Sequence, residues 1–327
     1  MKPARWVLAL FLAVVLTSGT WGVAHATPPP PRTPPSPPIP LPLLLPGAEI
    51  GALSQPAPRV GGTHEGVPEQ VPTGLSRVPD LPQLKAVLLV GPIDGNYGPQ
   101  TTREKANMDL AAAELEANGI TIFKFYTPEN DWAQIRAAAE GAHFLFYRGH
   151  GVYQGSMPSP TVGGFFLNDG FISSEDIRTG LKLAPNAIVM LYGCFTAGSS
   201  SIEGDSIGST EAQRRVAQYS APLLEIGAAG YYANWFGDAF QLFVRYLFRG
   251  MTLGQAYESF YDFNHTTVER HTDPDDSGLV IWLDKDYMRR HWQYDNAFVG
   301  LPEQTLVGLF SEKAYGIYLP VIAAAAR

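Results

Sequence analysis

The sequence has 327 residues, of which 45% are hydrophobic and 17% are charged, and its formal net charge at pH 7 is -8. This hydrophobic content is sufficient for a buried core and excludes a wholly disordered chain. The acidic balance, which no basic patch offsets, excludes a nucleic acid as partner, because binding to nucleic acids depends on Lys and Arg contacts to phosphate.

The first 26 residues predict a secretory signal peptide. Lys2 and Arg5 precede an apolar stretch at 6–16, and the Ala-His-Ala sequence at 24–26 offers a cleavage site at the usual spacing. The apolar stretch is shorter than the roughly 20 residues of a membrane span, and no later stretch reaches that length. The protein is therefore expected to be secreted or extracytoplasmic, without a transmembrane span, and association with the cell envelope is an alternative.

Three further regions follow the signal peptide. Residues 27–83 are rich in proline and glycine, which indicates a disordered tether or a pro-region. Residues 84–300 are long enough for one α/β domain of ordinary size. The role of the C-terminal extension at 301–327 is open, since a closing strand, a docking segment or an envelope-sorting tail would all fit.

Apolar runs of strand length alternate with helical patterns along the domain. The predicted strands are 85–91, 120–125, 143–147, 187–193 and 230–236. A helix is expected after each of the first two strands, a hairpin and a helix from Ser173 after the third, and a helix after each of the last two. Thr101 with Glu104, and Thr210 with Gln213, are interpreted as the caps of two of these helices. The alternation predicts an α/β fold, with a mostly parallel sheet and helices on both faces.

His150 and Cys194 each follow the end of a predicted strand, where open α/β sheets bind their ligands. Cys194 is the only cysteine, so it is a free thiol, an intermolecular link or a nucleophile. A thiolate and a nearby imidazole are the groups that amide hydrolysis needs. The alternative is a buried hydrophobic cysteine and a hydrogen-bonded histidine that share this edge by chance.

The segments HFLFYRGHG (143–151) and AIVMLYGCFTAG (187–198) resemble the two motifs of the caspase-like cysteine peptidases, a clan that includes gingipains and CHAT domains. The resemblance implies a three-layer caspase-like fold and a secreted endopeptidase with a His150/Cys194 dyad. It also implies that the backbone N–H groups of Gly151 and Cys194 bind the oxyanion. Tyr192 departs from the acidic residue that several members carry two positions before the cysteine, so specificity cannot be read there.

Two residues are candidates for substrate binding. Asp94 is the only charged residue of the loop after the first strand, and an anion in a partly dry pocket would select Arg or Lys before the cleaved bond. The alternative is that Asp94 stabilises a glycine-rich turn. Trp235, at the end of the fifth strand, either walls the same pocket or is a core aromatic residue. The dibasic pair Arg214 and Arg215, with the mobile Gly/Ser-rich segment expected before it, is a candidate site of autocleavage. The proline-rich region at 27–83 is the alternative.

No cofactor is required by this chemistry, but one segment matches a calcium-loop pattern. Asp273, Asp275, Ser277, Gly278 and Asp284 have the spacing of calcium ligands, although the helices that should flank them are doubtful and a polar turn is the alternative. The expected partner is a protein or peptide substrate. A second class of function also fits the sequence, namely a catalytically inactive caspase-like binding or scaffold module of the cell envelope.

Overall fold

The computed structural model describes residues 81, 83–272, 278–288 and 290–311. The predicted signal peptide, nearly all of the proline-rich region, and Asp273, Asp275 and Ser277 of the predicted calcium loop lie outside the described residues. In the part of the chain that is described, no helix has the length and apolar character needed to cross a membrane.

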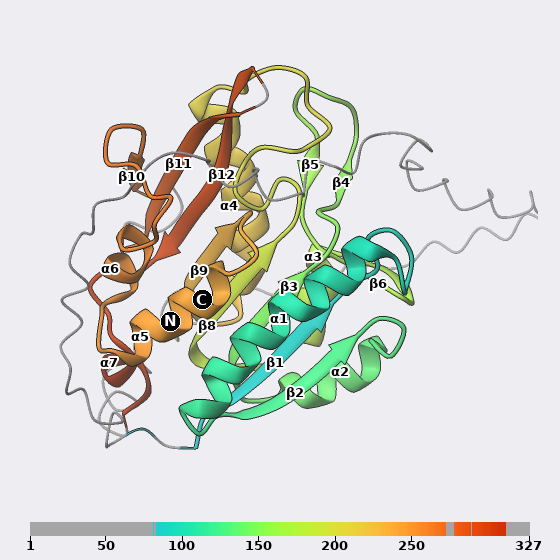
Figure 1. Ribbon diagram of the computed structural model, residues 1–327, viewed down its shortest axis with the longest axis vertical. Coiled ribbons are helices and arrows are strands. Elements are labelled where there is room, and N and C mark those ends of the chain that lie inside the picture. The colour runs from blue at the N-terminus through green and yellow to red at the C-terminus, as the bar shows by residue number, and fades with distance from the viewer. Residues whose placement is uncertain (1–80, 82, 273–277, 289, 312–327) are drawn as a thin grey trace, which may run out of the picture. The chain divides into compact units, whose positions relative to one another are not determined.

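The described strands form one main sheet of eight strands in the order β10-β11-β12-β9-β8-β3-β1-β2 (Figure 1). Strand β1 pairs in parallel with β2 and β3, and β8 pairs in parallel with β3 and β9, whereas β12 joins β9 and β11 antiparallel. The main-sheet strands are β1 (Lys85–Val90), β2 (Thr121–Tyr126), β3 (Ala142–Arg148), β8 (Leu183–Tyr192), β9 (Ala228–Asn234), β10 (Glu269–Thr272), β11 (Val280–Met288) and β12 (His291–Gly300). The predicted α/β fold with a mostly parallel sheet is confirmed, and its strand order is consistent with a caspase-like fold.

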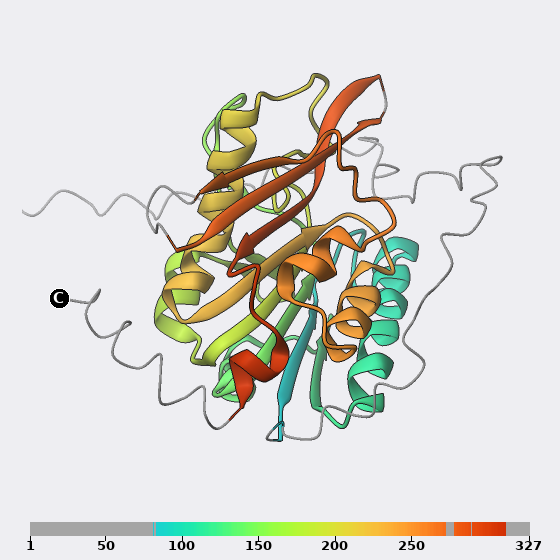
Figure 2. The same cartoon turned by 90° about the vertical axis from the view of Figure 1, so that its left-hand side faces the viewer.

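Helices cover both faces of this sheet, and Figure 2 shows the sheet between the two helical layers. Because successive side chains of a strand point to opposite faces, Val189 of β8 joins one apolar cluster while Ile188 and Met190 join the other. The first cluster packs against α2 (Trp132–Ala139), α3 (Ser174–Gly180) and α4 (Ser209–Glu225), and the second against α1 (Pro99–Ala117), α5 (Ala239–Phe248), α6 (Leu253–Glu258) and α7 (Leu306–Phe310).

Two predicted helix caps are wrong. Helix α1 begins at Pro99 after the N-cap Gly98, so Thr101 lies in its first turn. The Glu104 carboxylate accepts hydrogen bonds from Asn107 and Arg148. Helix α4 begins at Ser209 after the N-cap Gly208, which has no side chain to donate or accept. At both places a glycine directly precedes the helix, and at α1 the Asp94 side chain accepts from the first-turn N–H groups. The helix predicted from Ser173 is confirmed, with a capping box between Ser173 and Asp176.

Short hairpins connect β3 to β8. Strands β4 (Tyr153–Gln154) and β5 (Thr161–Val162) pair antiparallel, as do β6 (Phe165–Leu167) and β7 (Gly170–Ile172), the hairpin predicted in this region. The C-terminal region contributes α7, whose Leu306, Leu309 and Phe310 are buried in the second cluster. The hydrophobic core therefore continues beyond residue 300, and the docking alternative describes the first part of this region.

Candidate active site

The turns that carry His150 and Cys194 lie against each other at one edge of the sheet. Arg148 of β3 pairs with Tyr192 of β8, so both strands end at the same level. A Cβ atom added to Gly151 would lie 1.6 Å from the carbonyl oxygen of Cys194 and 2.6 Å from its nitrogen. The two turns thus contact each other backbone to backbone, which only glycine at this position permits. The structure brings together the turns that carry the two predicted dyad residues, and among the described contacts no hydrogen bond joins the His150 ring to the Cys194 sulfur.

The imidazole of His150 is oriented by a backbone carbonyl. Its Nε2 lies 2.9 Å from the carbonyl oxygen of Ile93. A carbonyl can only accept, so Nε2 carries the proton, and Nδ1 of the neutral ring is an acceptor. Nδ1 has no hydrogen-bond partner among the described residues. Burial lowers the pKa of His150, against the opposing effects of the Ile93 carbonyl and the negative charge of Asp94. The ring is therefore suited to act as a base at neutral pH.

Asp94 connects the loop that contains Ile93 with the start of α1. Its two carboxylate oxygens accept hydrogen bonds of 3.0 Å from the backbone N–H groups of Gln100 and Thr101. The Thr101 hydroxyl oxygen in turn accepts a 2.9 Å hydrogen bond from the N–H of Ile93. Desolvation alone would raise the pKa of Asp94, but these hydrogen bonds outweigh it and the pKa is lowered. The contacts favour the turn-stabilising alternative, in which Asp94 and Thr101 position Ile93 and hence His150.

Cys194 begins a tight turn whose backbone is fixed by hydrogen bonds. Phe195 has a positive φ of 69°, an uncommon conformation for a residue with a side chain. Its N–H donates to Ser199, and the N–H of Thr196 donates to Gly193. The Cys194 sulfur lies 3.2 Å from the hydroxyl oxygen of Ser201. Sequence analysis missed Ser201, because a serine in a Ser-rich stretch carries no signal of its own.

The two amides predicted to bind the oxyanion have no competing partner. Among the described residues, neither Gly151 nor Cys194 donates its N–H in a hydrogen bond, whereas the N–H of Gly149 donates to Tyr192 and that of Val152 to Tyr219. Unused donors beside a nucleophile are what a developing oxyanion requires. Their role stays a prediction.

A buried arginine at the end of β3 joins the elements around the dyad. Arg148 has no exposed side-chain surface and lies 2.7 Å from Glu104 of α1. It also donates to the carbonyls of Phe236 and Gly237, which follow β9, and its guanidinium stacks over the Tyr192 ring. In the sequence Arg148 is a charge at the end of an apolar run, but nothing there indicates that Glu104, between Arg103 and Lys105, is its partner. The segment that ends in His150 is thereby fixed from three sides.

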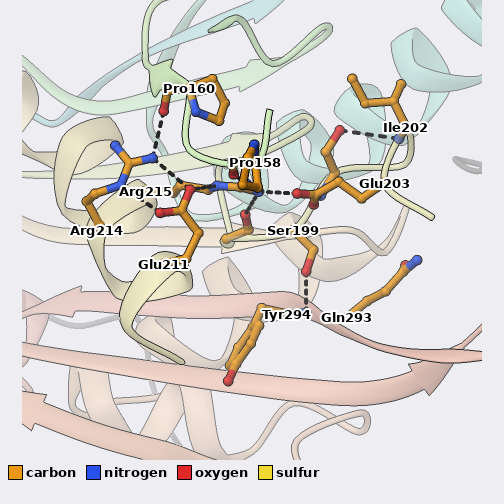
Figure 3. A network of polar contacts seen from close by, with 12 residues as sticks. Pro158, Pro160, Ser199, Ile202, Glu203, Glu211, Arg214, Arg215, Gln293 and Tyr294 are labelled. Atoms are coloured by element: carbon orange, nitrogen blue, oxygen red, sulfur yellow. Dashed lines mark hydrogen bonds and ion pairs between the residues drawn. The ribbon is translucent and has the colours of Figure 1, made fainter. Parts of the chain in front are cut away.

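A second buried arginine holds the segment after Cys194 (Figure 3). Arg215 of α4 lies 2.8 Å from Glu203 and 2.6 Å from Glu211, and it donates to the carbonyls of Gly198 and Pro158. Ser199 and Ser200 are buried. These ion pairs and carbonyl contacts bind the first part of the Ser-rich segment, up to Glu203, to α4. Residues 204–206 are exposed, so the expected mobility of the rest stays a prediction.

The same contacts bear on the proposed autocleavage site. Arg214 and Arg215 lie within α4, and Arg214 donates to the carbonyl of Pro160. A peptidase binds its substrate in an extended conformation, as a strand added to its site. Cleavage after either arginine is therefore incompatible with the folded α4.

The remaining candidates are placed as follows. Trp235 directly follows β9, is half-buried and packs against the same apolar cluster as Cys194, so both of its predicted roles stay open. Asp284 lies in β11, and its carboxylate accepts from the N–H of Asn264 and the hydroxyl of Thr267. The flanking elements β10 and β11 are strands, so the helix-flanked calcium loop is wrong for this segment.

Comparisons with known proteins give a distant structural likeness. No family model matches the sequence, and no curated protein matches it. Among solved structures, the chain is similar to the Arg-specific cysteine proteinase gingipain R (RGPB), at 12% sequence identity and a TM-score of 0.30. The match covers 69% of this chain and 62% of the gingipain chain, so this protein spans less than two thirds of that length. The likeness assigns no role to any residue of this chain.

Proposed function

We propose that the protein is a cysteine endopeptidase in which Cys194 is the nucleophile and His150 is the general acid and base. The observation that carries this proposal is the backbone contact between the His150 and Cys194 turns, combined with the Ile93 carbonyl that leaves Nδ1 of His150 unprotonated and free. The proposal requires that the Cys194 thiol approach this oriented imidazole, since an adjacent base is what activates cysteine nucleophiles.

The proposed reaction begins when Nδ1 of His150 takes the proton of the Cys194 thiol. The thiolate attacks the carbonyl carbon of the scissile bond, and the resulting oxyanion is stabilised by the N–H groups of Gly151 and Cys194. The carbon–nitrogen bond then breaks while His150 returns its proton to the leaving amine. A water molecule, deprotonated by His150, hydrolyses the thioester and releases the acid product and the free thiol.

The proposal does not extend to a preference for Arg or Lys before the cleaved bond. That preference was predicted from Asp94, whose carboxylate oxygens are used by the first turn of α1. Secretion of the enzyme, proposed from the signal-peptide pattern at 1–26, is independent of this mechanism.

The test is labelling and turnover with matched variants. A peptide that ends in a thiol-reactive group should label the wild-type protein, fail to label Cys194→Ala, and label His150→Ala at least about 100-fold more slowly. Hydrolysis of a peptide library should follow the same order. Alkylation of unfolded His150→Ala with iodoacetamide is the control that its thiol is intact.

Two outcomes would contradict the proposal. Turnover by Cys194→Ala at the wild-type rate would exclude Cys194 as the nucleophile. A folded wild-type protein whose Cys194 reacts with small alkylating agents but with no peptide probe would favour the alternative of a non-catalytic binding module.

A further inference from the structure

Three carboxylates that the mechanism does not use meet on the face of the sheet that carries α6. Asp262 follows α6, Asp286 lies in β11 and Asp295 lies in β12. One carboxylate oxygen from each residue lies within 4.8 Å of the other two. Like charges this close repel one another, so the cluster needs a compensating partner.

Asp295 distinguishes this cluster from a group of surface acids, because its carboxylate is buried. A β-bulge pairs Asp284 with Asn296 and Lys285 with Tyr294, which leaves Asp295 as the extra residue of β12. Asp295 is 1% exposed, and its Oδ2 has no hydrogen-bond partner. Burying an unpaired carboxylate is among the most costly events in folding. The bulge thus holds a buried acceptor that the described part of the protein leaves unsatisfied and directs it toward two further carboxylates.

The two strand residues of this cluster, Asp286 and Asp295, are not neutralised by a described cation. Within residues 83–272, 278–288 and 290–311, neither Asp286 nor Asp295 forms a salt bridge. The described ion pair of β11 with β10 joins Lys285 to Glu269. Successive residues of a strand face opposite sides of the sheet, so the Lys285 side chain is directed away from the face that carries Asp286.

We propose that Asp262, Asp286 and Asp295 bind a divalent cation of the size of Ca²⁺. Three carboxylate oxygens are hard ligands, which suit Ca²⁺ or Mg²⁺ and not the metals that prefer Cys or His. Ca²⁺ lies about 2.3–2.6 Å from its oxygen ligands, so oxygens on opposite sides of one ion are up to about 5 Å apart. Mg²⁺ requires contacts of about 2.1 Å and a near-ideal octahedron. Oxygens that lie within 4.8 Å of one another can contact either ion, but Ca²⁺ tolerates the irregular arrangement of ligands from three separate elements better than Mg²⁺ does.

This site differs from the calcium loop predicted from the sequence. It uses none of Asp273, Asp275 and Ser277, and the Asp284 carboxylate is already held by Asn264 and Thr267. Periodic spacing along the chain could not reveal it, because its three ligands come from three elements and one of them depends on a bulge.

The cation would brace the segment that follows β9. The N–H of Trp235 donates a 3.1 Å hydrogen bond to the carbonyl of Asp295. The ring of Phe236 contacts that of Phe260, two residues before Asp262, with centroids 5.5 Å apart. Since β9 lies beside β8 in the sheet, the end of β9 is next to the Cys194 turn. Binding should therefore stabilise this side of the candidate active site.

The proposal is tested by calorimetric titration and thermal unfolding of the full-length protein after removal of metals with a chelator. The Cys194→Ala background removes any self-cleavage, so the result does not depend on the proposed peptidase function. We expect CaCl₂ to bind with about one-to-one stoichiometry and, at about 5 mM, to raise the melting temperature by about 5 °C or more. MgCl₂ at the same concentration should have a much smaller effect.

Two variants and one control locate the site. Asp286→Asn and Asp295→Asn should each abolish the calcium response, whereas Asp205→Asn, a change at an exposed acid outside the cluster, should keep it. Without calcium, Asp295→Asn should melt no lower than its parent, because an amide of the same shape removes a buried unpaired charge. A purely structural carboxylate would give a lower melting temperature. Absence of a calcium response, or an unchanged response in Asp286→Asn, would overturn the proposal.

Discussion

Glycine at position 151 is required by the neighbouring turn. The carbonyl oxygen of Cys194 occupies the space in which any Cβ would lie, at 1.6 Å. We predict that Gly151→Ala separates the two turns and lowers kcat/KM by about 100-fold or more, since a displacement of about 1 Å is enough for such a loss. The same overpacking should lower the free energy of unfolding by about 1–3 kcal/mol.

Gly204→Ala is the matched control for this change, because no atom lies within 4 Å of the Cβ that it adds. Steady-state kinetics and urea unfolding of both variants give the comparison. Equal activity of Gly151→Ala and wild type would mean that the two turns do not need to touch for catalysis.

The environment of His150 predicts the acid limb of the pH–rate profile. Burial lowers the pKa of His150 below its ordinary value of 6.5, while the charge of Asp94 acts in the opposite direction. The base must be neutral, so kcat/KM should rise with pH through an apparent pKa below 6.5. Asp94→Asn removes the charge that favours the protonated ring, and it should move this limb to a still lower pH.

Kinetics at constant ionic strength from about pH 4 to pH 8 cover the predicted limb. A limb above pH 6.5 in the wild type, or an upward shift in Asp94→Asn, would show that a different group controls the reaction.

Helix α4 shows how one element stabilises a loop that has little hydrophobic surface of its own. Arg215 is fully buried, whereas 32% of the Arg214 side chain is exposed. Removing one member of a buried ion pair leaves the other unpaired, so Arg215→Ala should lower the free energy of unfolding by about 3–5 kcal/mol. Arg214→Ala should lower it by about 1 kcal/mol or less, because its ion pair with Glu211 is partly exposed.

Urea unfolding of the two variants, each in the Cys194→Ala background, measures the difference. Similar losses for the two neighbours would argue that the Arg215 contacts do not stabilise the segment after Cys194.

At the scale of single elements the strands were predictable, but the starts of α1 and α4 were not. A strand buried on both faces needs a continuous apolar run, and the runs at 85–91 and 187–193 were sufficient to place β1 and β8. The start of α1 is set by Asp94, which caps it from a preceding loop through side-chain contacts to the Gln100 and Thr101 amides. Local patterns indicate caps within the helix sequence, so a cap supplied from outside was missed.

At the scale of the whole molecule, α7 extends the hydrophobic core of the described residues beyond residue 300. Phe310 is fully buried and packs edge-on against Phe144 of β3, with ring centroids 5.9 Å apart. We predict that Phe310→Ala lowers the free energy of unfolding by about 3–5 kcal/mol, as buried aromatic truncations do. Val307→Ala changes a residue of the same helix that is 40% exposed. It should lower the free energy of unfolding by much less than Phe310→Ala does.

Chemical denaturation monitored by tryptophan fluorescence measures both variants. A neutral Phe310→Ala would restore the boundary at residue 300 that the sequence suggested.

The edge of the sheet that holds the dyad was predictable from sequence because parallel strands bring their carboxyl ends together. Two strand ends with His150 and Cys194 were enough to place both residues at one edge. The groups that orient them were not predictable, since the Ile93 carbonyl, Arg148 and Arg215 act through contacts between distant segments. A backbone carbonyl has no signature in the sequence. The burial of a charged residue can be predicted only when its partner is known.

The dibasic pair in α4 also allows proteolysis to measure how often α4 detaches from the rest of the protein. Trypsin cuts after arginine only where several residues can be drawn into an extended strand, and the contacts of Arg215 with Glu203, Gly198 and Pro158 forbid this in the native state. Nicking after Arg214 or Arg215 should then proceed only through molecules in which α4 has detached. When α4 reattaches faster than trypsin cuts, the rate of cleavage measures the free energy of that detachment. The amount of cleaved protein in a sample then reports how often α4 has detached from the segment after Cys194.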